Sequence, residues 1–135
     1  MTTTFEELTV GDQLPPLTID VSPRLIVAGA IASRDFQDVH HDKQAAIVSG
    51  APDIFMNILT SNGLAARFVT DWAGPRARLS AVAIRLGVPS RPGHQLEFHG
   101  SVEALDPHSR TATVAVHGTN SLGKHVTGMV KVAWS

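Results

Sequence analysis

One long stretch without charge, followed by four stretches of alternating side chains, limits what this chain can fold into. Between Asp53 and Arg67 no side chain is charged, and apolar residues recur near helical spacing from Ile54 to Val69. With Asp53 as its N-cap, this pattern predicts a helix over about residues 53–71. Such a helix of about 18 residues is roughly 27 Å long. Its lack of charge predicts that it is enclosed on most sides.

The second half of the chain changes to a period of two residues. Apolar side chains alternate there with small or polar ones, which predicts four strands with one buried face each, around residues 81–86, 96–104, 111–116 and 126–134. The breaks between these segments are short and rich in proline, glycine or turn residues. Connections of this length favour antiparallel neighbours.

The first part of the chain is predicted to add one strand and one helix. Leu17 to Asp20 alternate after a Pro-Pro turn, and Ser22 can cap a helix whose first turn contains Pro23. One apolar helix and an antiparallel sheet bury most surface when the sheet curls around the helix. We therefore predict an α+β protein with a hot-dog fold. A chain of 135 residues suits one core, so residues 1–135 are expected to form a single domain.

Composition narrows the chemistry open to the chain. It has no cysteine and no tyrosine, which excludes disulfides, thiolate ligands, a cysteine nucleophile and phenol acid–base chemistry. A formal net charge of −1 and 5% aromatic residues argue against binding to nucleic acid or to an anionic membrane surface. No apolar run approaches the roughly 20 residues that span a bilayer. The N-terminus resembles no signal peptide, so we expect a cytoplasmic protein.

Side chains suited to catalysis gather just before the predicted central helix. Three carboxylates and two imidazoles fall within eight positions, at Asp35, Asp38, His40, His41 and Asp42. In a first interpretation, Asp35 and His40 converge across a turn to position a water molecule and exchange its protons. Asp38 is then a surface residue, and His41 points away from its neighbour.

A second interpretation uses His40-His41-Asp42 as part of an iron site with two histidines and one carboxylate. This site needs one more histidine from the sheet, and the candidates are His94, His99, His117 and His125. Motifs of this kind normally lie on a strand, whereas the residues after Asp42 are typical of a helix. The first interpretation, without a metal, is therefore favoured.

Residues 33–46 resemble the hydratase signature of the MaoC-like (R)-specific enoyl-CoA hydratases, a hot-dog family with the pattern S-G-D-x-N-P-[LIV]-H-x-D-x-x-x-A. The matching positions are Ser33, Asp35, Val39, His40, Asp42 and Ala46. The departures are Arg34 for glycine, Gln37 for asparagine and Asp38 for proline. In addition, residues 91–93 read Arg-Pro-Gly, where the family often has R-P-G-D.

Longer stretches are similar to one branch of this family, and that branch shares the departures: residues 34–42, 53–55, 57–60, 69–75 and 85–89. The branch comprises the small subunits of heteromeric hydratases in actinobacterial steroid (cholesterol-type) side-chain degradation. The resemblance implies a hydro-lyase that adds water across the 2,3 double bond of an enoyl-CoA thioester, here a steroid side-chain thioester. It also implies a larger MaoC-like partner, often with a DUF35 (OB-type) domain, in a heterodimer or heterotetramer. A homodimer stays open for the chain expressed alone.

The resemblance assigns roles to individual residues. Asp35 and His40 hold the water, activate it and return its proton, and Asp42 orients the loop through hydrogen bonds. The backbone N–H of Asn57, at the start of the central helix, stabilises the thioester oxyanion. Candidates for contacts with the phosphates of coenzyme A are Arg85, Arg91 and Lys124. No metal and no cofactor are expected, because coenzyme A is part of the substrate.

Two other functions stay open from the sequence. A hot-dog acyl-CoA thioesterase would release free coenzyme A thiol from the same class of substrate. A non-catalytic hot-dog subunit would scaffold a partner or bind an acyl chain, but it has no need to keep Asp35 and His40 at the signature spacing.

Overall fold

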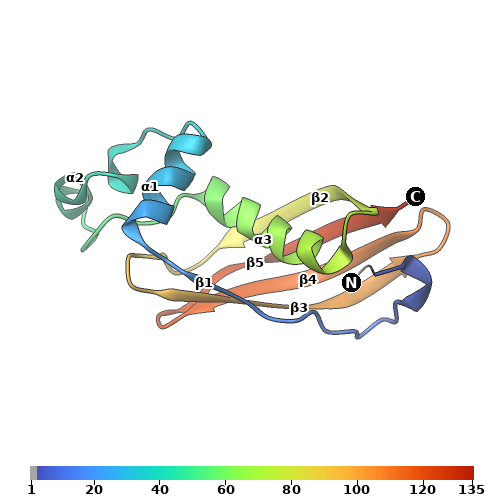
Figure 1. Ribbon diagram of the computed structural model, residues 1–135. Helices are drawn as coiled ribbons and strands as arrows, with labels where there is room; N and C mark the ends of the chain where they lie inside the picture. The colour runs from blue at the N-terminus through green and yellow to red at the C-terminus, as the bar shows by residue number, and fades with distance from the viewer. Residues whose placement is uncertain (1–2) are drawn as a thin grey trace.

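The computed structural model describes residues 3–135, and Figure 1 shows its helices and strands. In chain order these are β1 (Leu17–Asp20), α1 (Pro23–Ala32), α2 (Lys43–Val48), α3 (Ile58–Ala73), β2 (Ala77–Leu86), β3 (Gln95–Asp106), β4 (Thr111–Asn120) and β5 (Gly123–Trp134). The predicted first strand and the helix capped by Ser22 are confirmed, and the Ser22 hydroxyl accepts a hydrogen bond from the Leu25 N–H.

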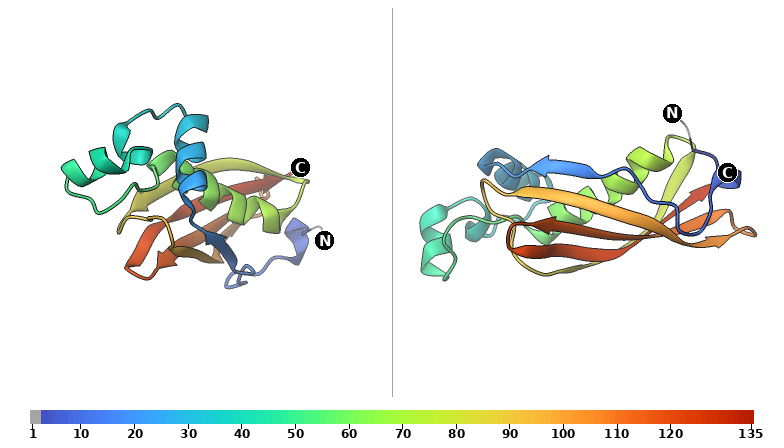
Figure 2. Two further views of the ribbon diagram at one scale, coloured as in Figure 1. Left: turned by 60° about the vertical axis from the view of Figure 1, so that its left-hand side comes forward. Right: turned by 90° about the horizontal axis from the view of Figure 1, so that it is seen from below.

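One antiparallel sheet of five strands curls around α3, in the order β1-β3-β4-β5-β2. The helix α3 lies along one face of the sheet, and α1 and α2 lie together at one end of it (Figures 1 and 2). This arrangement confirms the predicted hot-dog fold. The start of α3 lies at the same end of the sheet as α1 and α2 (Figure 1). The loops that connect α1, α2 and α3 are therefore close to the first turn of α3.

The strand order differs from the simple succession that the short connections predict. β3, β4 and β5 do follow one another, but β2 pairs with β5 and not with β3. The connection between β2 and β3 is fastened to β5, because the Gly87 and Val88 N–H groups donate to the His125 and Lys124 carbonyls. β2 is therefore an edge strand, on the opposite side of the sheet from β1.

The central helix begins later than predicted. Asn57 is its N-cap, and the Asn57 Oδ1 accepts from the Thr60 N–H at 3.1 Å. The predicted cap, Asp53, lies outside the helix. The residues between them are not helical, because the Met56 side chain is buried and its N–H donates to the Ser90 carbonyl. Their apolar character therefore reflects burial in the core and not a turn of helix.

The helix α3 buries one face against the sheet. Phe68 stacks on Phe98 of β3 with ring centroids 5.8 Å apart, and burying one such ring contributes roughly 1.5–3 kcal/mol. Gly100 permits this approach, since a Cβ there would lie 2.9 Å from the Phe68 ring. Ile58 and Leu59, in the first turn, remain half exposed. The expected enclosure on most sides is thus wrong for this chain by itself, because a single sheet covers one side of a helix.

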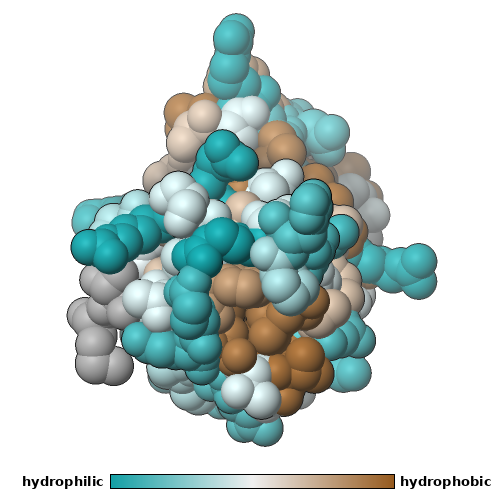
Figure 3. Space-filling model, turned by 90° about the vertical axis from the view of Figure 1, so that its right-hand side faces the viewer, coloured by the Kyte–Doolittle hydropathy of each residue, from teal (hydrophilic) through white to brown (hydrophobic). Residues whose placement is uncertain are grey.

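The end of the molecule opposite α1 and α2 is shown in Figure 3, and its surface is largely hydrophilic with one apolar patch. The described residues share one sheet and one principal core. A single domain over 1–135 stays a prediction, because Met1 and Thr2 lie outside the described residues. Within residues 3–135, no helix has the length and apolar character needed to cross a membrane.

Candidate active site

Asp35 is positioned by the way α1 ends. The Asp35 N–H donates to the Ala30 carbonyl at 2.8 Å and the Arg34 N–H to the Ile31 carbonyl at 3.0 Å, the pair of bonds that defines a Schellman motif. Arg34 has a φ of 59°, in the left-handed region that favours glycine. The hydratase signature has glycine at this position. Arg34 therefore forms the same turn as the glycine of the signature, but its left-handed conformation costs conformational free energy.

The Asp35 carboxylate accepts hydrogen bonds from two donors. The Asn57 Nδ2 donates to its Oδ2 at 3.1 Å, and the Gln37 N–H donates to its Oδ1 at 3.3 Å. The same Asn57 amide also donates to the Ser33 hydroxyl at 3.0 Å. The bond from Asn57 is the main cause that lowers the pKa of the Asp35 carboxyl, with smaller contributions from Gln37 and His40 against partial desolvation. Asp35 is therefore a carboxylate at neutral pH.

His40 faces Asp35 from the 3₁₀ turn Asp38–His40. Its Nε2 lies 3.3 Å from the Asp35 Oδ2, and its side chain is 7% exposed. Its Nδ1 lies 2.7 Å from the Phe55 carbonyl oxygen, which can only accept, so Nδ1 carries the proton and Nε2 of the neutral ring has a free lone pair. The Asp35 carboxylate and the His40 Nε2 therefore face the same point, where both are close enough to contact one small molecule.

These two side chains open into a cavity of about 360 Å³. One wall contains Asp35, His40 and the residues that lead into α3, and the facing wall is the segment from Leu86 to Pro89. The buried His125 of β5 also lines the cavity. The lining thus combines mainly apolar residues with a few polar groups, the composition typical of small-molecule sites.

Asn57 lines the same cavity from the N-terminus of α3. In residues 3–135 its backbone N–H donates to no protein acceptor, and a helix N-terminus favours a negatively charged group. The oxyanion role of this N–H stays a prediction. The role of the Asn57 side chain toward Asp35 was missed by sequence reasoning, because the bond joins residues 22 positions apart. An asparagine before an apolar helical run signals an N-cap, but nothing local signals its second partner.

The other predicted site residues, Asp42, Arg85, Arg91 and Lys124, are not among the residues that line this cavity. Asp42 is the N-cap of α2, and its Oδ1 accepts from the Ala45 N–H at 3.2 Å. Arg85 and Lys124 each neighbour a lining residue in the chain, and Arg91 lies in the β2–β3 connection. Contacts of these three cations with coenzyme A stay predictions.

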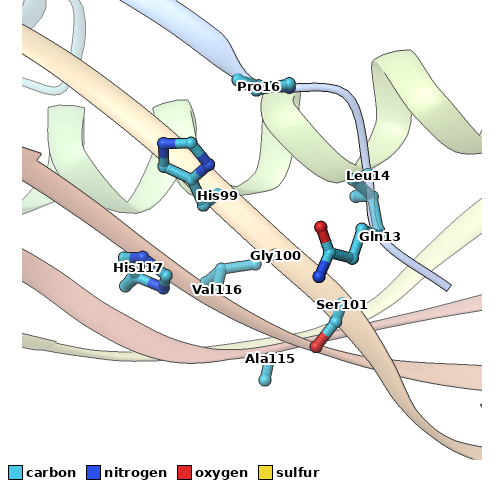
Figure 4. A pocket seen from close by; sticks show the side chains of 9 residues that line it. All are labelled: Gln13, Leu14, Pro16, His99, Gly100, Ser101, Ala115, Val116 and His117. Atoms are coloured by element: carbon cyan, nitrogen blue, oxygen red, sulfur yellow. The ribbon is translucent and has the colours of Figure 1, made fainter. Parts of the chain in front are cut away.

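The geometry does not bring together the residues of the alternative iron site. His99 and His117 stack on each other with ring centroids 5.6 Å apart, on the face of the sheet that points away from α3. They line a separate hollow of about 490 Å³ between β3, β4 and the segment before β1 (Figure 4). Among the described residues no three His, Asp or Glu side chains are placed to hold a metal ion. His40 instead directs its two ring nitrogens to Phe55 and Asp35.

A hot-dog fold with an aspartate and a histidine facing each other at a cavity, beside the N-terminus of the central helix, is the arrangement that the hydratase signature predicts. No family model matches the sequence. The chain is 48% identical over 124 residues to the 3-oxo-4,17-pregnadiene-20-carboxyl-CoA hydratase beta subunit of Mycobacterium tuberculosis, covering 92% of this chain and 95% of that one. The chain belongs to the MaoC-like hydratase family.

Solved structures agree with this assignment. The crystal structure of the ChsH1-ChsH2 complex from Mycobacterium tuberculosis contains a chain with 46% identity and a TM-score of 0.90, over 94% of this chain and 98% of that chain. A MaoC-like dehydratase has 30% identity and a TM-score of 0.89, over 99% of this chain and 43% of that chain.

Proposed function

We propose that this chain is a subunit of an enoyl-CoA hydratase, with Asp35 and His40 as its catalytic residues. The observation that carries the proposal is the 3.3 Å approach of the Asp35 Oδ2 to the His40 Nε2, whose ring is oriented by the Phe55 carbonyl. The 48% identity to a protein named as a CoA hydratase subunit supports it.

In the proposed reaction the water donates one O–H to the Asp35 carboxylate and the other to the His40 Nε2. As the water oxygen bonds to Cβ, one O–H bond breaks and its proton moves to Nε2. The electrons of the double bond move toward the thioester oxygen, which accepts a hydrogen bond from the Asn57 N–H. The imidazolium, stabilised beside Asp35, then returns a proton to Cα, so that one water is added in total. Neither a metal nor a cofactor takes part.

We infer that the acyl group is a steroid side chain, because the relative acts by its name on a pregnadiene carboxyl-CoA. A cavity of about 360 Å³ is at the lower end of ligand-binding pockets, which span about 300–1,000 Å³. A steroid thioester therefore needs walls beyond this chain. The candidates for the CoA phosphates are Arg85, Arg91 and Lys124.

The partner that supplies these walls is proposed to be a larger MaoC-like subunit with a DUF35 domain, in a heterodimer or heterotetramer. Apolar side chains remain exposed beside the cavity, among them Phe36 at 63% and Ile58 at 50%, and such groups mark protein interfaces. Among residues 3–135, β2 pairs with β5 and with no other strand, so its other edge is available to a strand of the partner. The ChsH1-ChsH2 complex supports a two-subunit assembly.

The test is co-expression with the partner subunit, followed by the loss of enoyl-thioester absorbance for substrates from crotonyl-CoA to steroid side-chain thioesters. Asp35→Asn and His40→Ala are each expected to lower kcat by about 10²- to 10⁴-fold, with assembly intact. Asp38→Asn is the matched control, since this carboxylate lies in the same loop but is exposed to solvent. Full activity of either catalytic-pair variant would contradict the assignment. Release of free thiol instead of hydration would indicate a thioesterase.

A further inference from the structure

His125 lies inside the molecule although the alternation of β5 points it outward. Its neighbour Val126 faces the core, so a regular strand would place residue 125 on the other face of the sheet. Instead the pairing of β4 with β5 passes from Gly118–Val126 directly to Thr119–Lys124 and leaves His125 out of register. A bulge of this kind redirects a side chain, and His125 is only 1% exposed.

Both ring nitrogens of His125 have partners in the interior. Nδ1 lies 2.7 Å from the Val88 carbonyl oxygen, so it donates its proton there. Nε2 of the neutral ring then accepts from the Ser61 hydroxyl at 2.7 Å. Burial is the main cause that lowers the pKa of the His125 imidazole, with His94 acting in the same direction against the bond to Val88. The ring is therefore neutral, as this pair of bonds requires.

Ser61 connects this ring to the catalytic wall of the cavity. It lies in the first turn of α3, fully buried. Its N–H donates to the Asn57 carbonyl at 3.3 Å, and its hydroxyl lies 3.4 Å from the same oxygen. Asn57 in turn donates through its side chain to the Asp35 carboxylate. The Ser61 hydroxyl has one proton, which it donates to His125, so its bond to Asn57 is the one from its backbone N–H. Side-chain hydrogen bonds thus join the Val88 carbonyl through His125 to Ser61, and the first turn of α3 joins Ser61 to Asn57 and so to Asp35.

We propose that His125 and Ser61 are positioning residues for the hydration reaction, which hold Asn57 and Asp35 at a set distance from the facing wall of the cavity. The first end of the chain holds Val88 in the apolar wall, and the second holds the carboxylate that binds the water. The inference rests on the proposed function, because it concerns the same site. Ser61 does not line the cavity, and His125 lines it with both ring nitrogens bonded to Ser61 and Val88, so both residues act through Asn57 and Val88.

Two variants break the bond between Ser61 and His125 from opposite sides and leave a donor to the Val88 carbonyl in place. Ser61→Ala removes the hydroxyl and leaves the bond from His125 to Val88. His125→Asn keeps an amide N–H where Nδ1 donates to Val88, but offers nothing to Ser61. Ser90→Ala is the matched control, because Ser90 is equally buried and its hydroxyl accepts only from Asn120, outside the chain to Asp35. All are measured in the assembled complex, with kcat and KM determined across pH.

We expect kcat to fall by about 10- to 100-fold in Ser61→Ala and His125→Asn, since small misplacements of catalytic groups have effects of this size. KM is expected to change less than kcat, and the acid limb of the kcat/KM profile to shift to higher pH. That limb reports the Asp35–His40 pair, because the proposed reaction needs both an ionised Asp35 carboxylate and a lone pair on the His40 Nε2. The groups that face Asp35 from the C-cap of α1 and the N-cap of α3, Ser33 and Asn57, carry no charge.

A merely structural role would lower thermal stability and leave the acid limb in place. The inference is overturned if both variants match Ser90→Ala in kcat and in the position of the acid limb. If His125→Asn fails to assemble, Ser61→Ala alone decides the result, because it deletes a single oxygen. An inactive wild-type complex would instead overturn the proposed function, so the two failures are distinguishable.

Discussion

Asn57 offers the sharpest test of the site, because its side chain both caps α3 and donates a hydrogen bond to Asp35. Its Oδ1 accepts from the Thr60 N–H at 3.1 Å and caps α3, whereas its Nδ2 donates to Asp35 at 3.1 Å and to Ser33 at 3.0 Å. Asn57→Ala removes both functions. Asn57→Ser keeps an oxygen that can cap the helix, but it has no N–H to donate to Asp35. Comparison of the two variants separates the cap from the contact with the carboxylate.

The expected effects differ in kind. Loss of an N-cap costs about 1 kcal/mol of unfolding free energy, within a range of about 0.5–2 kcal/mol, which for a domain of this size lowers Tm by roughly 4 °C. Serine at this position is expected to retain most of that stability. Both variants remove the main cause that lowers the pKa of the Asp35 carboxyl. That pKa therefore rises in both, and the acid limb of kcat/KM moves to higher pH in both.

The same linkage gives a sign for stability against pH. A carboxyl whose pKa is lowered on folding stabilises the protein above its unfolded pKa, and this contribution is lost as pH falls through the folded pKa. The stability difference between wild type and Asn57→Ser should therefore be present at neutral pH and shrink in acid. Thermal unfolding across pH and hydration kinetics of the assembled complex measure both effects. An acid limb that stays at the wild-type pH in both variants would refute the reasoning.

Three further predictions concern the surroundings of the site. Gly29→Ala is expected to destabilise the protein by about 1–3 kcal/mol, because its Cβ would lie 2.2 Å from the Thr60 Oγ1. Gly63→Ala is the control: no atom lies within 4 Å of its Cβ, so its Tm in a thermal melt should be unchanged or higher. Arg34→Gly should raise Tm, since it relieves a left-handed residue at φ 59° worth about 1 kcal/mol; an unchanged or lower Tm would speak against strain there. Phe36→Asp should weaken assembly with the larger subunit in light scattering and leave the Tm of the isolated chain unchanged; equal assembly would show that this side chain lies outside the interface.

The sequence predicted the elements better than their partners. The alternation in β3, β4 and β5 follows from one buried face, and the cap at Ser22 follows from local hydrogen bonding, so both were correct. The predicted start of α3 was wrong. Ile54 and Met56 are buried in the core without being helical, and their spacing in the sequence also fits the buried face of a helix. The pairing of β2 with β5 was missed because a short connection does not reveal that it passes over the end of the sheet.

What the sequence determined by itself was the kind of chemistry and the kind of fold. One helix, four alternating segments and an Asp-His pair near their junction are encoded in residue types and in spacings of a few positions. Tertiary structure decided how the site is assembled. The Asn57 bond to Asp35 spans 22 positions and the His40 bond to Phe55 spans 15. The bulge that turns His125 inward arises from the register of two strands, and no local pattern contains contacts of this range.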